Sequence, residues 1–502
     1  MKPVLQRLMK RGPTYDPAVS AALAPRARSH GPAPLPTWRA RWQRLRQATL
    51  RGELLAVLGT VALVTVPLPA LLPSLNDWAV LEWHVAATSD GVEYGHSGPV
   101  LTLLSLYVAL LLFRYVAFLT ASAIDAAFQQ RGDDDRLASE RERLQVGRGL
   151  PFVSIVVPAY NEGPVIRQSI ASLLTLDYPC YEVLVIDDGS SDDTSARALE
   201  AAAGSSRVRV IRKANGGKSS ALNLGLMQAR GTLVLNMDAD SKLSGNTLRA
   251  CVRHFEDPRV GAVAGNIKVA NRENLVTRLQ AIEYIQGLAL ERRAQSSMQA
   301  VSVIGGPLGM FRRDALLAAG GYDHDTFAED RDLTLKLLAQ GWSVTYESTA
   351  LAHAESPSRW LDLLNQRYRW TRGTVQCVLK HWRLLGALRS APVACLSLWY
   401  MAADSFIVPL ASLFMLGFFA HATMAYGSFE TLFLWWLLAA LFDVAVTAYC
   451  LALDEEDARL LPSVLAYRFY AIFADITKTI ATAEELLHLE MNWGKLTREG
   501  KI

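Results

Sequence analysis

Several patterns that identify common protein classes are missing from this 502-residue chain. Its five cysteines are scattered without CxxC spacing, which argues against a zinc site or a disulfide framework, and we interpret them as reduced, packed thiols. No GxxxxGK[ST] loop occurs, which excludes an ATP-driven machine of the P-loop kind. The net charge of +3 is too small to indicate nucleic acid as a partner.

Apolar residues, by contrast, are abundant. They make up 51% of the chain while charged residues reach 20%, which predicts a membrane protein that also carries a water-soluble domain. Residues 54–75 and 100–124 form two apolar stretches that are long enough to cross a bilayer. Residues 76–98 between them have acids but no lysine or arginine, which predicts an extracytoplasmic loop.

The charge of the N-terminal segment supports the same orientation. Residues 1–50 carry ten lysines or arginines against the single acid Asp16, as the positive-inside rule expects of a cytoplasmic segment. A disordered basic tail without a partner is a compatible alternative. The segment is too long and too rich in proline for a secretory signal peptide.

Three more apolar stretches follow residue 390, at 396–424, 432–453 and 461–482. The last contains Arg468, Asp475 and Lys478, so both a span that lines a polar path and an interfacial helix stay open. The basic, aromatic segment before them either lies along the membrane surface, which we favour, or packs on the soluble domain. The predicted divisions are a basic cytoplasmic segment (1–50), two transmembrane helices (51–124), a soluble domain (150–356), interfacial helices (357–390), C-terminal transmembrane helices (391–482) and a tail (483–502).

Within the soluble domain, strand-like and helix-like patterns alternate, which is typical of βαβ units and a parallel sheet. Each candidate strand ends in polar residues, at the edge where open α/β sheets bind ligands. The expected strands are 153–157, 183–186, 208–211 and 233–236, and the expected helices are 165–174, 196–203 and 219–229.

Three acidic motifs follow these strands. The sequences VVPAYNE (156–162) and VIDDGSSDDT (185–194) are each, on their own, equally compatible with ordinary turn and helix-cap chemistry. In LNMDADS (235–241), Asp238 and Asp240 alternate at the end of an apolar strand, where two carboxylates repel unless a cation bridges them. Hard oxygen ligands of this kind suit Mg²⁺ or Mn²⁺.

Two further motifs lie closer to the C-terminus. FAEDRDL (327–333) places acids before a helix-like run at 333–340, either to complement a helix dipole or to let Asp330 take a proton from a hydroxyl that attacks an activated sugar. In QRYRW (366–370), a basic side chain could neutralise a leaving diphosphate and the tryptophan could stack on a sugar ring. The alternative is a membrane-surface helix with snorkelling arginines.

Taken together and in this order, PAYNE, DDGS, DAD, AED and QRYRW resemble the processive, membrane-bound family 2 glycosyltransferases, which make cellulose, chitin, hyaluronan and poly-N-acetylglucosamine. The resemblance spans roughly residues 150–375. It implies an α/β GT-A fold, a Rossmann-like parallel sheet in a cytoplasmic domain embedded between transmembrane α-helices. Segments 261–266 and 283–288 look most like the poly-β-1,6-N-acetylglucosamine synthases.

The resemblance also implies an activity. It is inverting, metal-dependent transfer of a sugar from a UDP-sugar to the end of a growing glycan, coupled to export across the bacterial inner membrane. The alternatives are another β-glycan synthase, a non-processive transferase with a lipid acceptor, an inactive scaffold subunit or a transporter. The implied partners are the UDP-sugar, the glycan, the lipid bilayer and a small membrane or periplasmic export subunit.

Residue roles follow from the same resemblance, position by position. Asp330 would be the general base with Glu329 beside it, and Asp240, together with Asp238, would bind Mg²⁺ or Mn²⁺. The glycine-rich segment 304–313 resembles the floor of an acceptor pocket, where glycine permits close approach of a sugar. The implied donor-binding residues are Tyr160, Glu162, Asp188, Lys218 and Asp238, and the implied acceptor and pyrophosphate residues are Gln366, Arg369 and Trp370.

Overall fold

The computed structural model describes residues 107, 110–127, 149–426, 429–454, 456 and 458–489. The basic segment 1–50, the first apolar stretch at 54–75, the loop at 76–98 and the end of the tail therefore lie outside the described residues. Of the second apolar stretch, the structure describes a helix at Leu110–Ala127.

An eight-stranded sheet forms the centre of the soluble domain, with the strand order β3-β2-β1-β4-β7-β6-β8-β5. Strand β1 pairs in parallel with β2 and β4, and β2 pairs in parallel with β3, which confirms the four strands expected from the sequence. The strands are β1 (Val153–Ala159), β2 (Tyr181–Asp187), β3 (Val208–Arg212), β4 (Leu233–Asn236), β5 (Ser241–Leu243), β6 (Val260–Val269), β7 (Gly309–Arg312) and β8 (Ser343–Ala354).

The parallel strands expected from the sequence make up one half of the sheet, and the other half is mixed. Strand β7 runs antiparallel to both β4 and β6, and β5 runs antiparallel to β8, whereas β6 and β8 are parallel. A short, fully buried apolar strand has the same pattern in either direction, and therefore only the path of the chain determines its orientation.

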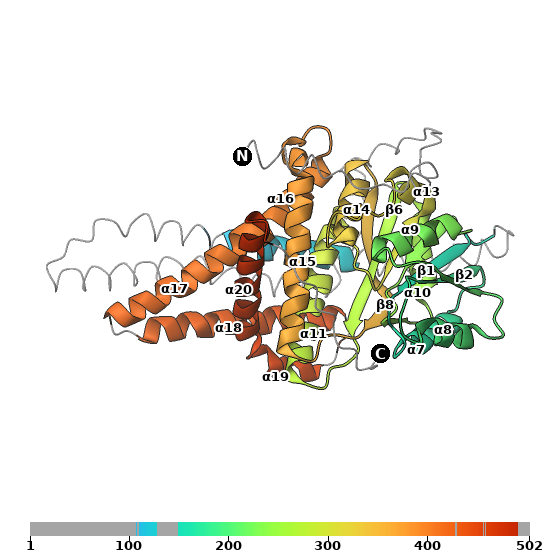
Figure 1. Ribbon diagram of the computed structural model, residues 1–502. Coiled ribbons are helices and arrows are strands. Elements are labelled where there is room, and N and C mark those ends of the chain that lie inside the picture. The colour runs from blue at the N-terminus through green and yellow to red at the C-terminus, as the bar shows by residue number, and fades with distance from the viewer. Residues whose placement is uncertain are drawn as a thin grey trace.

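Helices cover both faces of the sheet (Figure 1). Ile155 and Val157 of β1 belong to the core under α7 and α8, and Val156 belongs to the core under α9 and α14. Burial of both faces explains the near-continuous apolar strands. The helices of this domain are α7 (Ile166–Leu174), α8 (Thr194–Ala202), α9 (Lys218–Gln228), α10 (Thr247–Val252), α11 (Leu275–Ile285), α12 (Arg293–Ser297), α13 (Arg313–Ala318) and α14 (Glu329–Ala339), with a π-helical turn η2 (Gln286–Arg292) after α11.

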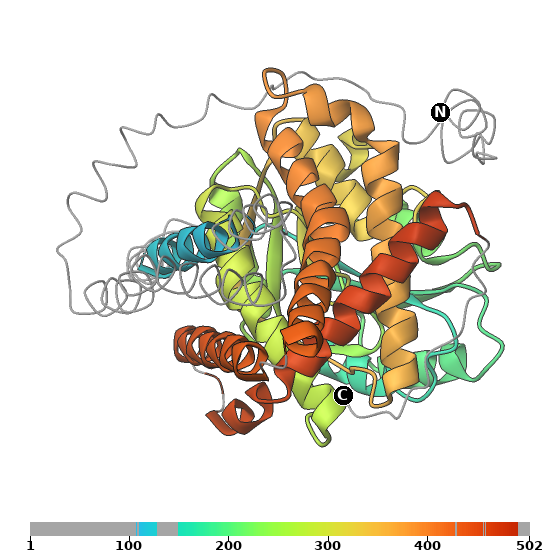
Figure 2. The same cartoon turned by 90° about the vertical axis from the view of Figure 1, so that its left-hand side faces the viewer.

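A second, helical region extends from the sheet, with α17 and α18 pointing away and α15 and α20 between them and the sheet (Figure 1). Figure 2 shows α17, α18 and the helix at 110–127 from that side. Leu119, Ile282 and Cys450 share one core, which joins the helix at 110–127 to α11 and α18. The elements are α15 (Trp360–Lys380), η3 (Trp382–Gly386), α16 (Pro392–Ala402), η4 (Ala403–Ile407), α17 (Val408–Tyr426), α18 (Phe429–Leu453), α19 (Leu461–Val464) and α20 (Tyr467–Leu486).

Two described helices, Leu110–Ala127 and Pro392–His421, are long and apolar enough to cross a membrane. The pair Ala458–Val464 and Tyr467–Leu486 passes the same test only jointly and is bent by 66°, as in a broken span or a re-entrant loop. The multi-pass arrangement stays a prediction. Helix α15, expected at the membrane surface, packs on α14 as well as on α20, and Gly373 lies against Ala328.

Candidate active site

The first two motifs form one loop cluster at the carboxyl edge of the sheet. Asn161, at a φ of 54°, accepts a hydrogen bond from the backbone N–H of Ser191 (2.7 Å) and donates its own N–H to Ser190 Oγ (2.9 Å). The Glu162 N–H donates to Thr194 Oγ1 (2.8 Å). The cluster leaves the Tyr160 side chain 45% exposed.

Asp188 lies at the centre of a second set of contacts. Its carboxylate accepts hydrogen bonds from Lys213 Nζ (2.6 Å), Gly216 N (3.0 Å) and Gly217 N (2.8 Å). Gly217 has a φ of 85°, a backbone conformation that suits glycine, and α9 begins at the next residue. Asp188 therefore holds the loop that presents Lys218, while its role toward a donor stays a prediction.

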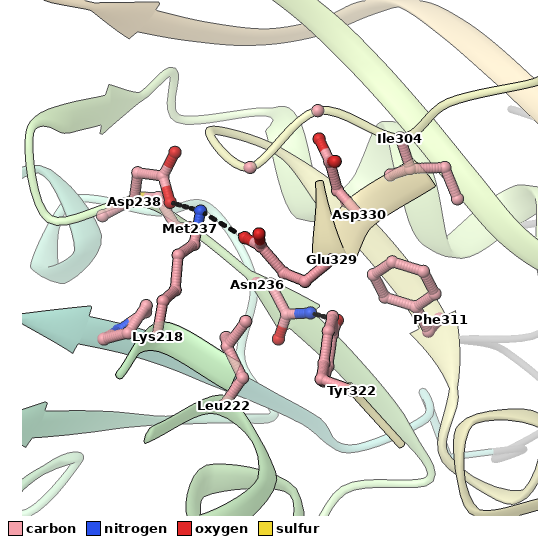
Figure 3. Close-up of a pocket in the computed structure, with 14 residues that line it drawn as sticks. Lys218, Leu222, Asn236, Met237, Asp238, Ile304, Phe311, Tyr322, Glu329 and Asp330 are labelled. Atoms are coloured by element: carbon pink, nitrogen blue, oxygen red, sulfur yellow. Dashed lines mark hydrogen bonds and ion pairs between the residues drawn. The ribbon is translucent and has the colours of Figure 1, made fainter. Parts of the chain in front are cut away.

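Lys218 connects two predicted motifs within one pocket (Figure 3). Its ammonium lies 2.7 Å from Asp238 Oδ1 and 3.0 Å from Glu329 Oε1. Asp330 lines the same pocket. Four of the predicted site residues thus converge from α9, from the end of β4 and from the first turn of α14.

The protonation behaviour of Asp330 follows from this setting. Removal from water and the neighbouring Glu329 carboxylate raise the pKa of Asp330 to about 6. Removal from water lowers the pKa of Lys218, but Asp238 and Glu329 outweigh this effect and keep it well above its ordinary value. At neutral pH the pocket thus combines an ionised carboxylate of raised basicity with a charged ammonium, as a general base and an anion site require.

Asn236 and Tyr322 line the pocket but were not anticipated as site residues, whereas Gly306 lies in the segment 304–313 that was expected to form the floor of an acceptor pocket. Asn236 donates a hydrogen bond to the hydroxyl of Tyr322. The side chain of Asn223 fixes the Tyr322 backbone, because its Nδ2 donates to the Tyr322 carbonyl oxygen (2.8 Å) and its Oδ1 accepts from the Tyr322 N–H (2.9 Å). A Cβ added at Gly306 would lie 2.4 Å from Asp238 Oδ2 and 2.8 Å from Lys218 Nζ. The glycine pair in the segment 304–313 signals this close approach, whereas no sequence signal marks Tyr322.

The other predicted residues lie outside the lining of this pocket. Gln366, Arg369 and Trp370 are on α15, whereas Tyr160, Glu162 and Asp188 lie in the loops that follow β1 and β2. Gln366 is buried, and Arg369 and Trp370 are half-buried. The deeply buried arginine of the QRYRW motif is Arg367, and the role predicted for Arg369 stays a prediction.

Asp238 and Asp240 offer a donor set that fits a hard divalent cation. Both side chains are half-buried, and Ser241 Oγ lies 3.3 Å from Asp240 Oδ1. Carboxylate and hydroxyl oxygens are suitable ligands for Mg²⁺ or Mn²⁺. Among the described residues, Asp323, Asp325 and Asp332 form a separate acidic group that could also hold an ion. Lys336 and Lys380 already compensate the negative charge of this group.

Comparisons with known proteins agree with this geometry. Residues 154–318 match the family described as Glycosyl transferase family 2. Poly-beta-1,6-N-acetyl-D-glucosamine synthase of Staphylococcus aureus (strain COL) is 30% identical over 232 residues, and that of Staphylococcus epidermidis is 31% identical over 229 residues. These alignments cover 46% and 45% of this chain, and 56% of each relative, so the chain spans little more than half of their length.

A solved structure supports the fold. The mannosyltransferase PcManGT from Pyrobaculum calidifontis, in complex with GDP-Man and Mn²⁺, superposes with a TM-score of 0.51 at 24% identity and covers 74% of this chain and 100% of its own. Over residues 154–318, the family match agrees with the resemblance of the motifs, and the structure has the expected GT-A fold class with a mixed sheet.

Proposed function

We propose that this chain, whose residues 154–318 are a family 2 glycosyltransferase domain, transfers N-acetylglucosamine from its UDP-activated form to the end of a growing glycan. The observation that carries the proposal is the convergence of Lys218, Asp238, Glu329 and Asp330 in one pocket. The choice of sugar rests on the likeness to the poly-N-acetylglucosamine synthases. We place the domain at the cytoplasmic face of a bacterial inner membrane.

In the proposed reaction, Asp330 removes the proton from the acceptor hydroxyl as its oxygen attacks the anomeric carbon from the face opposite UDP. The bond between that carbon and the diphosphate oxygen breaks, and the proton stays on the Asp330 carboxylate. An α-linked donor therefore gives a β-linked product. Lys218 lies where its charge would stabilise the negative charge that develops on the diphosphate.

Asp238 and Asp240 would hold Mg²⁺ or Mn²⁺ in this proposal. When bound, the ion would neutralise charge on the leaving diphosphate. Lys218 supplies positive charge beside the Asp238 carboxylate, and Gly306 leaves the space that a diphosphate needs there.

Ion pairs among the apolar helices support the proposed passage of the product through the membrane. Lys478 of α20 pairs with Asp404 (3.0 Å), and Arg468 of α20 pairs with Asp443 of α18 (2.7 Å). Charged residues within a bundle of membrane helices commonly face its interior and mark a polar path. This pattern favours the span interpretation of α20 and leaves a small export subunit as a candidate partner.

The test is UDP release by the purified full chain in nanodiscs, with Mg²⁺ or Mn²⁺, from UDP-N-acetylglucosamine, UDP-glucose and UDP-glucuronate. Asp330→Asn should abolish release, whereas Asp314→Asn should not, because Asp314 is an exposed acid in the first turn of α13. Release from UDP-N-acetylglucosamine with a long, glycosidase-sensitive product supports the proposal. Another donor would change the product, a short lipid-linked product would indicate the non-processive alternative, and no release from any donor would overturn the proposal.

A further inference from the structure

The QRYRW segment has a buried centre that its predicted roles do not explain. Arg367 is 6% exposed, and it donates a hydrogen bond from Nη1 to Gln366 Oε1 at 2.7 Å. Its guanidinium carbon lies 4.3 Å from the centroid of the Trp370 ring, within the range of a cation–π contact. Arg367 therefore contacts two of the three side chains that are predicted to hold the acceptor.

The opposite side of Arg367 is fixed by two other helices. Its Nη2 donates to the carboxylate of Glu283 on α11 and to the hydroxyl of Tyr470 on α20 (3.1 Å). The Tyr470 hydroxyl donates to Glu283 Oε2 at 2.6 Å, which closes a triangle of hydrogen bonds. A planar guanidinium with several donors retains little freedom in such a setting, so the orientation of Arg367 is well defined.

An aromatic ring of α11 also lies close to the Arg367 guanidinium. Arg367 lies 6.0 Å from the ring centroid of Tyr284, the residue after Glu283. Burial and the nearby charges of Glu283 and Asp240 raise the pKa of Tyr284, although Arg367 counteracts them.

We propose that Arg367, held by Glu283 and Tyr470, is a positioning residue that orients Gln366 and Trp370 toward the acceptor sugar. The inference rests on the proposed function, since it needs a glycan acceptor. It gives a role to Glu283 in the segment 283–288. It also makes acceptor binding depend on the position of α20, because Tyr470 of that helix helps to hold Arg367. Side chains that hold a binding group commonly matter as much for its geometry as the group itself.

The same two helices offer a matched control. Arg372 of α15 donates to Glu485 Oε2 of α20 at 2.5 Å and to the backbone oxygen of Leu489 at 2.6 Å. Like Arg367 it is buried and joins α15 to α20, but it contacts neither Gln366 nor Trp370 in any described interaction. A purely structural role would give Arg367→Lys and Arg372→Lys similar consequences.

The experiment measures UDP release by the full chain in nanodiscs, with the donor and then a β-linked N-acetylglucosamine oligomer as the varied substrate. We expect Arg367→Lys to raise the KM for the oligomer about tenfold and to shorten the product, while the KM for the donor changes less than about twofold. Tyr470→Phe should act in the same direction but more weakly, since Glu283 still holds Arg367. Arg372→Lys should leave both KM values within about twofold of wild type.

The outcomes separate the two proposals. If wild type releases UDP and Arg367→Lys changes the donor and oligomer KM values alike, or matches Arg372→Lys, the positioning role is overturned and the proposed function stands. If wild type releases no UDP from any donor, the proposed function fails and the inference fails with it.

Discussion

The first turn of α14 carries two aspartates whose surroundings differ sharply. Asp330 faces the pocket beside Glu329, and burial together with this second acid raises its pKa to about 6. Asp332, two residues later, is fully buried among bases: its carboxylate bonds to His381 (2.6 Å) and pairs with Lys380 (3.0 Å). Although burial alone would raise the pKa of Asp332, His381 and Lys380 lower it to about 2.

The contrast shows that position in a helix does not decide what an acid does. Both aspartates occupy the same favourable end of the helix dipole, yet the pKa of Asp330 is raised, whereas Asp332 fastens α14 to the end of α15. Charge compensation also explains how Asp323, Asp325 and Asp332 can lie close together without a metal ion. Lys336 and Lys380 supply the positive charge that a cation would otherwise provide. In the pocket, by contrast, burial and Glu329 outweigh the nearby positive charges at Asp330, and perturbed acids of this kind are common at functional sites.

The largest predicted effect separates chemistry from donor binding. Asp330→Asn should lower kcat by about 10²- to 10⁴-fold, because a general base contributes about that much. Its affinity for UDP, measured by calorimetry, should stay close to wild type, since Lys218 and Asp238 are retained. An Asp330→Asn variant with near-normal kcat would remove the distinction between the two aspartates.

The next prediction concerns the space beside Asp238. Gly306→Ala would place a Cβ 2.4 Å from Asp238 Oδ2, and the displacement of that carboxylate should lower kcat/KM about 100-fold. Gly386→Ala is the matched control, because no atom lies within 4 Å of the Cβ that it would add. Equal activity of the two variants would show that the pocket does not require this close approach.

A pH profile tests the cause of the raised basicity of Asp330. The base must be ionised, so lowering the pH through its pKa of about 6 removes activity, and at pH 5 about a tenth of the plateau kcat should remain. Glu329→Gln removes the neighbouring charge that raises this pKa. The acid limb of the profile should therefore move to lower pH, even if the substitution also changes the plateau value of kcat. An unmoved limb would mean that Glu329 does not control Asp330.

The smallest effect on activity is expected at the other aspartate. Asp332→Asn should keep kcat within about twofold of wild type but lower the temperature of thermal unfolding, because Lys380 loses a buried partner. The pKa of Asp332 is lowered on folding, so this stabilisation is present above the unfolded pKa and is lost as the pH falls toward 2. Unfolding temperatures of the variant and wild type should therefore converge in acid.

Much of the site could be predicted because its parts are local. Acids placed directly after apolar strands identify the carboxyl edge, and Asp238 was found in this way, whereas Asp330 was found as an acid that precedes a helix-like run. The helix expected at 333–340 begins instead at Glu329, since acids in a first helical turn resemble a polar loop. The antiparallel β7 was missed because a four-residue strand, GMFR, is too short to carry a pattern and its direction depends on the path of the chain.

What the sequence could not supply depends on the docking of distant helices. A helical repeat shows that α15 has a buried face. It does not show that Arg367 is the deeply buried arginine, because this depends on Glu283 and Tyr470, which lie 84 and 103 residues away from Arg367 in sequence. The opposite behaviour of Asp330 and Asp332 likewise depends on Lys380 and His381 of the α15 end, not on any local pattern.

The most direct measurement follows labelled N-acetylglucosamine from its UDP donor into polymer, with wild type, Asp330→Asn and Asp332→Asn prepared side by side in nanodiscs. We expect incorporation by wild type and Asp332→Asn and none above background by Asp330→Asn. Incorporation by Asp330→Asn at the wild-type rate, or its loss in a folded Asp332→Asn alone, would contradict the assignment of Asp330 as the base.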